Sequence, residues 1–270
     1  MAAGLSIHVG LNKVDPDRYD GWDGELVACE NDARDMARLA RARGFSDTVL
    51  LTAECTVENV TAALRQAAGK LAPDDILLFT YSGHGGQVPD VTGPDDEPDE
   101  LDETLVLYDR QFLDDEVHQE FRGFADGVRI LALLDCCHSG TAIEVPGAAT
   151  PETGVRLMPV WKQQQIFERD QGFFQELQRS LKKASPDGGA QEPGAILISG
   201  CQDNQFASDG AVNGAFTEAL LEVWDEGAFR GGYRPFHRAI QSRLPATQSP
   251  NLYTTGSPAP AFLRQKPFTV

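Results

Sequence analysis

Cysteine, basic side chains and long apolar runs are all scarce in this chain of 270 residues. Its five cysteines form no CxxC pair, and an odd number argues against a set of disulfides or a structural zinc site. No apolar run is long enough to cross a bilayer, and the N-terminal residues have neither the basic nor the long apolar region of a signal peptide. We therefore expect a cytoplasmic protein with no membrane partner.

Basic residues are few relative to acidic ones. The chain has 41 Asp and Glu against 23 Lys and Arg, which gives a formal net charge of −18. Such a chain repels a phosphate backbone, so we exclude a nucleic-acid partner. Solubility explains most of the acidic excess, while metal cations and basic peptides are the partners that it would attract.

Apolar runs alternate with amphipathic stretches along the chain. Strands are expected at residues 5–11, 48–51, 76–81, 104–108, 128–134, 195–199 and, at a sheet edge, 252–255. Helices are expected at residues 30–43, 56–71, 161–183, 214–225 and 235–244, with a short one beginning at 114. This order favours an α/β fold with a mostly parallel sheet and helices on both faces.

We expect one domain over residues 1–270, with three regions. Residues 145–194 interrupt the alternation, since Pro, Gly, Ala and Thr dominate up to Pro159 and the sequence Ser-Pro-Asp-Gly-Gly begins at Ser185. This middle region is the best candidate for a linker or insert. It separates a larger region, 1–144, from a smaller one, 195–270.

Two of the expected strands end in chemically active residues. One runs into Ser82-Gly83-His84-Gly85-Gly86, and the other into Asp135-Cys136-Cys137-His138-Ser139-Gly140. In open α/β sheets, ligands bind beyond the carboxyl ends of the strands. If these two strands are parallel neighbours, a thiol and an imidazole meet at one edge of the sheet.

A thiol beside an imidazole is the chemistry of a cysteine nucleophile. Cys137 can supply the thiolate, His84 the base, and the backbone N–H groups of Gly85 and Cys137 the oxyanion donors. His138 is a rival base, but adjacent residues of an extended chain point apart. The non-catalytic alternative for Cys136 and Cys137 is a pair of buried core thiols, which we accept for Cys136. For His84 it is a histidine in a tight glycine turn.

The segment from Asp95 to Glu103 is densely acidic. It is not an EF-hand, because Glu100 occupies the position that needs glycine. A solvated loop and a site for a hard cation held by several carboxylates both remain open.

Together these motifs resemble the metacaspases, which are caspase-like cysteine peptidases of clan CD, family C14. About 50 residues separate His84 from Cys137, as in caspases. The ordered series continues through five further stretches: Cys29-Glu30-Asn31-Asp32-Ala33, Asp102-Glu103-Thr104-Leu105, Asp114-Asp115-Glu116, Ser199-Gly200-Cys201-Gln202-Asp203-Asn204-Gln205 and Gln248-Ser249-Pro250-Asn251-Leu252. We expect the bacterial or type I-like form, without a prodomain.

The resemblance implies the caspase-hemoglobinase fold, a three-layer sandwich around a mostly parallel sheet. It also implies a Cys137–His84 dyad and a pocket for Arg or Lys that is lined by Asp32 and Asp135 with Cys29 and Ser82. Two carboxylates suit a guanidinium or ammonium group and disfavour the acidic side chain that true caspases accept.

The resemblance further implies an activating calcium ion and no organic cofactor. The metal carboxylates would be Asp99, Asp114, Asp115 and Glu144, the last in place of the more usual Asp. Lys and Arg residues from Arg156 to Lys183 make 145–194 a candidate autoprocessing region.

The leading hypothesis is a monomeric cysteine endopeptidase that cleaves peptides or proteins after Arg or Lys. The alternative is a catalytically silent, calcium-responsive or scaffold protein on the same fold. A redox sensor built from Cys136 and Cys137 ranks last, since adjacent cysteines form a strained disulfide.

Overall fold

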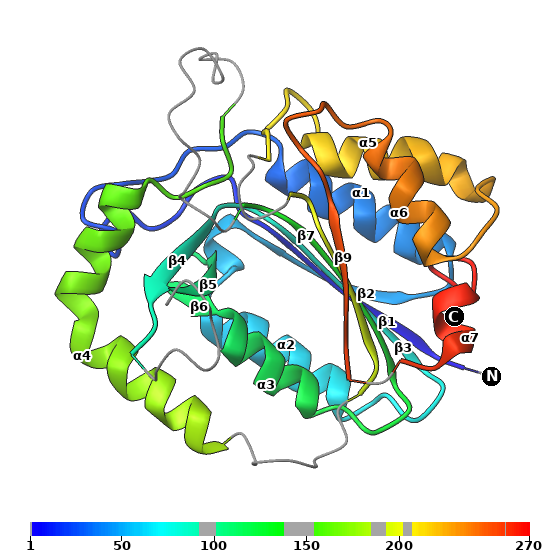
Figure 1. The fold of residues 1–270 in the computed structure, drawn as a ribbon, viewed down its shortest axis with the longest axis horizontal. Helices are drawn as coiled ribbons and strands as arrows, with labels where there is room; N and C mark the ends of the chain where they lie inside the picture. Colours follow the sequence, from blue (N-terminus) through cyan, green and yellow to red (C-terminus); the bar gives the residue numbers. More distant parts are fainter. Residues whose placement is uncertain (1, 92–100, 138–153, 185–192, 202–206, 257) are drawn as a thin grey trace.

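A mostly parallel sheet forms the centre of the molecule (Figure 1). The computed structural model describes residues 2–91, 101–137, 154–184, 193–201, 207–256 and 258–270. In these residues the main sheet has six strands in the order β2-β1-β3-β7-β8-β9. All neighbours pair in parallel except β9, which is antiparallel to β8. The strands are β1 Gly4–Gly10, β2 Ser46–Leu51, β3 Ile76–Ser82, β7 Arg129–Asp135, β8 Ala195–Ser199 and β9 Asn251–Thr255.

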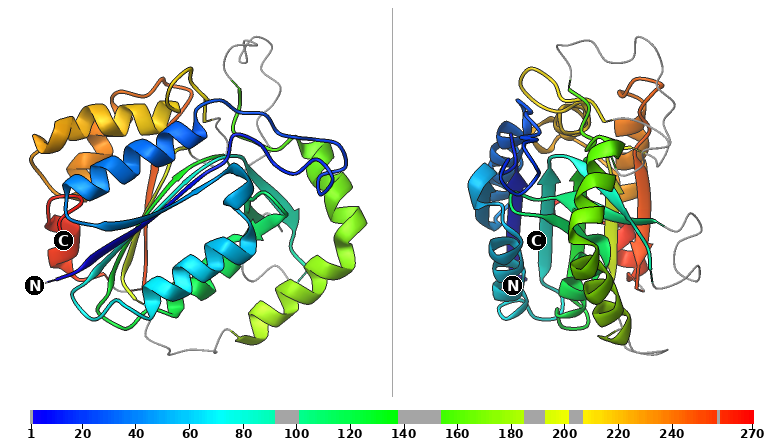
Figure 2. Two further views of the ribbon diagram at one scale, coloured as in Figure 1. Left: turned by 180° about the vertical axis from the view of Figure 1, so that it is seen from behind. Right: turned by 90° about the vertical axis from the view of Figure 1, so that its left-hand side faces the viewer.

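Helices cover both faces of this sheet (Figures 1 and 2). Side chains alternate along a strand, so β3 sends Leu77 and Phe79 to one apolar core and Ile76 and Leu78 to the other. The first core contains α2 Val57–Ala68 and α3 Asp114–Arg122. The second contains α1 Cys29–Ala42, α5 Ala215–Trp224, α6 Tyr233–Gln241 and α7 Pro260–Arg264. The α/β sandwich expected from the sequence is confirmed.

A smaller antiparallel sheet adjoins the main one. Its order is β4-β5-β6, with β4 Gly85–Pro89, β5 Leu101–Val106 and β6 Gln111–Leu113. The long helix α4 Val160–Ala184 packs on it through Ile166, Phe167 and Phe174. The sequence predicted α4 but not β4, because its glycines carry no strand periodicity. The single-turn helices η1 Thr52–Glu54 and η2 Asp225–Gly227 complete the described elements.

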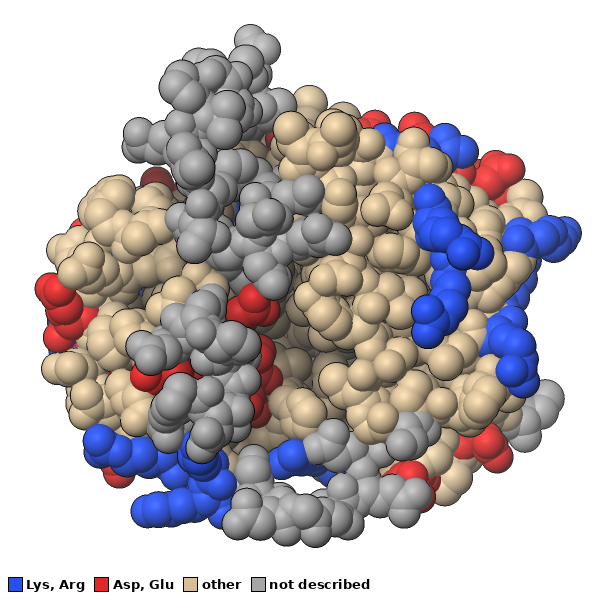
Figure 3. Space-filling view, in the orientation of Figure 1, with Lys and Arg blue, Asp and Glu red and all other residues tan. Residues whose placement is uncertain are grey.

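Charged side chains are unevenly spread over the surface. In Figure 3, Lys and Arg gather in two places, at the right-hand edge over the region of α5, α6 and α7 and at the lower left over the lower part of α4, while much of the remaining face is uncharged. Among the helices in the described ranges, none combines the length and apolar character needed to cross a membrane.

Candidate active site

The two strands that end in reactive residues are neighbours, as predicted. β3 and β7 pair in parallel, and the register sets Ser82 opposite Asp135. His84 and Cys137 each follow two residues later, so both lie beyond the same carboxyl edge of the sheet. The parallel pairing of distant strands therefore brings the imidazole and the thiol to one place.

His84 is buried and held by backbone. Its Nε2 lies 3.0 Å from the carbonyl oxygen of Gly24, which can only accept, so Nε2 carries the proton. Nδ1 is buried without a hydrogen-bond partner in the described part of the chain, and its lone pair is available. Burial lowers the pKa of His84 to about 4, although the Gly24 carbonyl partly opposes this. The imidazole is therefore neutral at pH 7, as a base must be.

Cys137 is also fully buried. Its sulfur accepts a hydrogen bond from the backbone N–H of Ala207 and lies 3.0 Å from the sulfur of Cys201. The contacts of the described residues include no hydrogen bond between the Cys137 thiol and the His84 imidazole. Cys136 belongs to a different environment, the apolar core beneath the sheet, as the sequence predicted.

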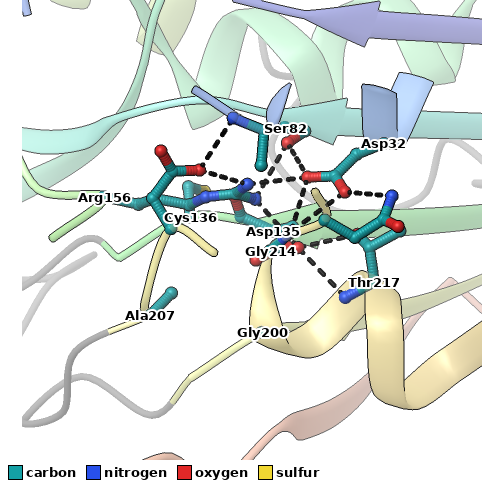
Figure 4. A network of polar contacts seen from close by, with 12 residues as sticks. Asp32, Ser82, Asp135, Cys136, Arg156, Gly200, Ala207, Gly214 and Thr217 are labelled. Carbon is teal, nitrogen blue, oxygen red and sulfur yellow. Dashed lines mark hydrogen bonds and ion pairs between the residues drawn. The ribbon is translucent and has the colours of Figure 1, made fainter. Parts of the chain in front are cut away.

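An arginine from the expected linker fills the space beside these residues (Figure 4). The side chain of Arg156 is 0% exposed. Its Nη1 donates to Ser82 Oγ at 2.8 Å and pairs with Asp135 Oδ2 at 2.9 Å. Its Nη2 pairs with Asp32 Oδ2 at 2.7 Å and with Asp209 Oδ1 at 2.9 Å. One guanidinium thus bridges three buried carboxylates.

Electrostatics hold this guanidinium in its charged form. Burial alone would lower the pKa of Arg156, but Asp135, Asp32 and Asp209, together with Cys29, raise it well above its usual range. Burial raises the pKa of Asp135, with Arg156 opposing the shift. The pocket is matched to a cation, and without one its carboxylates would be left unpaired.

The four residues expected to line a basic pocket do surround Arg156. Ser82 Oγ donates to Asp32 Oδ2 at 2.7 Å, which fixes both side chains. Asp135 Oδ2 accepts from Thr217 Oγ1 at 2.7 Å. Cys29 is buried at the start of α1 near this pocket. Burial raises its pKa to about 12, so the thiol is uncharged at pH 7 and adds no charge to the pocket.

The carbonyl oxygen of Arg156 lies within hydrogen-bond distance of the two N–H groups that the sequence predicted as oxyanion donors. Gly85 N and Cys137 N are each 3.1 Å from it. Two donors aimed at one carbonyl oxygen polarise that carbonyl and would stabilise negative charge on it. Gly85 is required here, because a Cβ would lie 1.8 Å from the carbonyl oxygen of Cys137.

The sequence matches the caspase domain, a peptidase family, over residues 14–264. The chain belongs to this family. Metacaspase-1 of Mycosarcoma maydis is 32% identical over 259 residues, covering 81% of this chain and 61% of that protein. Metacaspase-1 of Schizosaccharomyces pombe is 31% identical over 261 residues, covering 81% and 58%. This caspase-like chain thus spans about three fifths of the length of these curated relatives.

Two solved structures show the same architecture. Protein GSU0716 from Geobacter sulfurreducens is 45% identical and matches with a TM-score of 0.88, covering 99% of each chain. Caspase-1 from Spodoptera frugiperda is 13% identical, with a TM-score of 0.61 over 93% of this chain and 86% of that one. At that identity the second match establishes the fold alone.

Sequence analysis missed four parts of this caspase-like site. Asp209 not only binds Arg156 but also accepts from the N–H groups of Val27 and Ala28, at 2.6 and 3.2 Å. Gly24 orients His84, and Gly214 leaves room for the guanidinium, since a Cβ there would lie 2.4 Å from Arg156 Cζ. Arg156 itself was grouped with the other basic residues of the middle region. No local motif marks any of them, because each acts through a tertiary contact.

The expected metal carboxylates are only partly described. Asp99 and Glu144 lie outside the described residues, as does the rival base His138. Asp114 and Asp115 are exposed at the start of α3, and the pairing of Thr104 with Leu113 brings Glu103 to the same end of the β5–β6 ladder. Carboxylates of this kind suit a hard cation. The described residues alone contain no group of three or more His, Cys, Asp or Glu that could hold a metal.

Proposed function

We propose that this caspase-like chain is a cysteine endopeptidase that cleaves after arginine and, less efficiently, after lysine. One observation carries the proposal: an arginine of the chain lies in a three-carboxylate pocket with its carbonyl oxygen 3.1 Å from both Gly85 N and Cys137 N. That is how a peptidase holds the residue on the amino side of the bond that it cuts.

The reaction uses two side chains and two backbone amides. His84 Nδ1 takes the thiol proton of Cys137, and the sulfur, released from the N–H of Ala207, attacks the substrate carbonyl carbon. The N–H groups of Gly85 and Cys137 hold the oxygen as it becomes negative. His84 then gives its proton to the leaving amine, and the acyl group remains on sulfur as a thioester. Water, deprotonated by His84, hydrolyses the thioester and restores the thiol.

The carbonyl of Gly24 supports this cycle by orienting the base. It accepts a hydrogen bond from the Nε2–H of His84, so the proton stays on Nε2 and the lone pair of Nδ1 is free to take the thiol proton. The imidazolium formed during the reaction keeps this hydrogen bond, which stabilises the charge.

The same pocket favours arginine over lysine. The two terminal nitrogens of Arg156 reach opposite sides, Nη1 to Asp135 and Nη2 to both Asp32 and Asp209. A lysine ammonium ends about where Arg156 Cζ lies, so it cannot contact all three carboxylates directly. An acidic side chain would be repelled.

Calcium activation is the second part of the proposal. Asp99, Asp114, Asp115 and Glu144 would supply carboxylate oxygens, the donors that calcium prefers. The bound ion would offset their mutual repulsion. No step of the reaction above passes through it.

A catalytically silent, calcium-responsive or scaffold protein on the same fold is the alternative. The observation that favours it is the filled pocket, because Arg156 is fully buried where a substrate side chain would bind. A protein whose pocket never opened would bind calcium without cleaving anything.

One assay separates the two functions. The purified chain is incubated with fluorogenic peptides ending in Arg, Lys or Asp, with and without calcium, beside Cys137→Ala. We expect turnover of Arg above Lys, none of Asp, and none by Cys137→Ala. Cys55→Ala is the matched control, since it removes a buried thiol elsewhere in the core. Two results would contradict the proposal: turnover by Cys137→Ala, or no turnover by any form of the chain.

A further inference from the structure

The stretch of sequence from Gly227 to the last residue carries only positive charge. All 41 Asp and Glu residues of the chain precede it, and the whole chain has a formal net charge of −18. Its basic residues are Arg230, Arg234, Arg238, Arg243, Arg264 and Lys266. Charge asymmetry of this kind indicates a surface that meets an anionic partner.

These basic residues gather on one side of the folded chain. The right-hand group of blue side chains in Figure 3 lies over α6 and α7. Arg234 and Arg238 are about one turn apart on α6, and Arg264 is the last residue of α7. All three are exposed, and none forms an ion pair with any residue that the structure describes. By contrast, Arg243 pairs with Glu222 at 3.1 Å. We call Arg234, Arg238, Arg264 and the groove beside them the α6–α7 surface.

The sequence of α6 is less stabilising than it could be. Arg234 lies in the first turn, where the helix dipole favours acidic residues, and that turn contains none. Arg234 and Arg238 are also like charges four residues apart, which destabilises a helix. Nearby, desolvation and the positive charges of Arg230 and Arg43 lower the pKa of Lys266. A bound anion would relieve this repulsion, so the free chain is less stable here than the chain with an anionic partner.

A groove lies among these charges. It has a volume of about 470 Å³ and is lined by Gly232, Arg234, Pro235, Pro260, Leu263 and Arg264. Pro235, Pro260 and Leu263 give it an apolar wall, which suits an apolar side chain. Carboxylates beside that side chain would meet arginines, which can hold a carboxylate through two parallel hydrogen bonds. The groove therefore fits a protein segment in which acidic residues flank an apolar one.

The α6–α7 surface is at the opposite end of the main sheet from the reacting thiol. Arg129, the first residue of β7, donates to Gln265 Oε1 at 2.9 Å and to the carbonyl oxygen of Thr269 at 3.2 Å. The chain just after α7 therefore packs where β7 begins. β7 ends at Asp135, just before Cys137. A partner on the α6–α7 surface would leave the active site free.

We propose that the α6–α7 surface docks an acidic segment of another protein, with an apolar side chain in the groove and carboxylates on Arg234 and Arg264. A nucleic acid or an anionic membrane fits less well, because the groove has an apolar wall. An extended polyanion would also be repelled by the rest of the chain, which carries the whole acidic excess. A short acidic segment meets the basic region alone. This docking does not require the chain to be a peptidase.

Fluorescence anisotropy with a labelled peptide tests the docking. The peptide has a central leucine between two runs of glutamate, and it has no basic residue, so the carboxylates around Arg156 repel it. We expect saturable binding that weakens at least about threefold between about 0.1 and 1 M salt, because the Debye length falls from about 10 to 3 Å. A peptide with glutamine in place of glutamate should not bind, and one with serine in place of leucine should bind more weakly.

Charge reversal locates the site on the chain. Arg234→Glu and Arg264→Glu should each weaken binding about 2- to 30-fold, because each replaces an attraction with a repulsion of similar size. Arg18→Glu makes the same change of charge at an exposed arginine outside the α6–α7 surface, and it should bind like the wild type. Without peptide, Arg234→Glu should melt no lower than the wild type, because it removes a like-charge pair and adds an acid to the first turn of α6. Lost binding would therefore not reflect unfolding.

Four results would overturn the proposal. The first is no salt-dependent binding of the leucine–glutamate peptide by the wild-type chain, and the second is equal binding by the wild type, Arg234→Glu and Arg264→Glu. The third is tighter binding of single-stranded DNA or of anionic lipid vesicles than of the peptide, lost in these two variants. The fourth is concentration-dependent self-association that Arg234→Glu abolishes in analytical ultracentrifugation, which would make a second copy of the chain the partner.

Discussion

Replacing Asp209 with asparagine removes one of the three carboxylates from the pocket while keeping the size of the side chain. Asp209 Oδ1 lies 2.9 Å from Arg156 Nη2, and both side chains are at least nine-tenths buried. A hydrogen bond to a charged group contributes about 1.5–3 kcal/mol, so kcat/KM for an Arg peptide should fall about 10- to 150-fold. A Lys peptide should lose less, because its ammonium cannot contact all three carboxylates directly, and the ratio of Arg to Lys cleavage should therefore decrease.

The assay compares Arg and Lys peptides in the Arg156→Gln background, where the chain does not occupy its own pocket. Asp126→Asn, the same chemical change on an exposed loop, is the matched control. Because Asp209 also accepts from Val27 N and Ala28 N, a thermal melt must accompany the kinetics. An unchanged ratio of Arg to Lys cleavage, at any absolute rate, would refute the assignment of Asp209 to specificity.

Three further predictions concern the same chain. Burial lowers the pKa of His8 from 6.5 to about 3 and that of His84 from 6.5 to about 4. Between each lowered pKa and pH 6.5, the unfolded chain therefore binds more protons than the folded chain does. Stability should be full above pH 6.5 and fall as the pH drops, by up to about 1.4 kcal/mol per pH unit for each histidine, as measured by urea unfolding. Hydrogen peroxide should join Cys137 to Cys201, whose sulfurs are 3.0 Å apart, and abolish turnover until dithiothreitol is added. Gly85→Ala should reduce turnover at least about 100-fold, because its Cβ displaces an oxyanion donor.

Each of these three has its own control. His8→Asn should halve the acid dependence of stability, and an unchanged dependence in that variant would exclude His8 as a source of it. Cys201→Ala should resist the reversible loss of turnover, and equal sensitivity in that variant would exclude the disulfide. Gly172→Ala, where nothing lies within 4 Å of the added Cβ, should keep full turnover.

Sequence reasoning succeeded where local pattern decides the structure. The apolar runs that became β3 and β7 and the polar residues after them predicted which side chains would meet, because parallel neighbours carry their ends to one edge. A helix was expected from residue 56, and Thr56 does cap it, because its Oγ1 accepts from the N–H of Asn59 at 3.2 Å. Such features depend on a few adjacent residues.

Sequence reasoning failed where the position of a residue depends on contacts with residues that are distant in the sequence. β4 was missed because Gly85 and Gly86 carry no strand pattern, although they pair with Leu105 and Thr104. Arg156 looked like one basic residue among several in a region expected to be a linker. The role of Arg156 becomes visible only in the structure, where Asp32, Asp135 and Asp209 come together from three separate parts of the chain and bind its guanidinium.

The pairing of β7 with β8 has a consequence for any chain that is cut between them. Five registered pairs, from Ile130 with Ala195 to Leu134 with Ser199, join residues on opposite sides of the middle region. The two pieces would remain together as a noncovalent heterodimer that shares one sheet. Its folding would then be second order, and its melting temperature would rise with concentration, which is true of complexes but not of single chains.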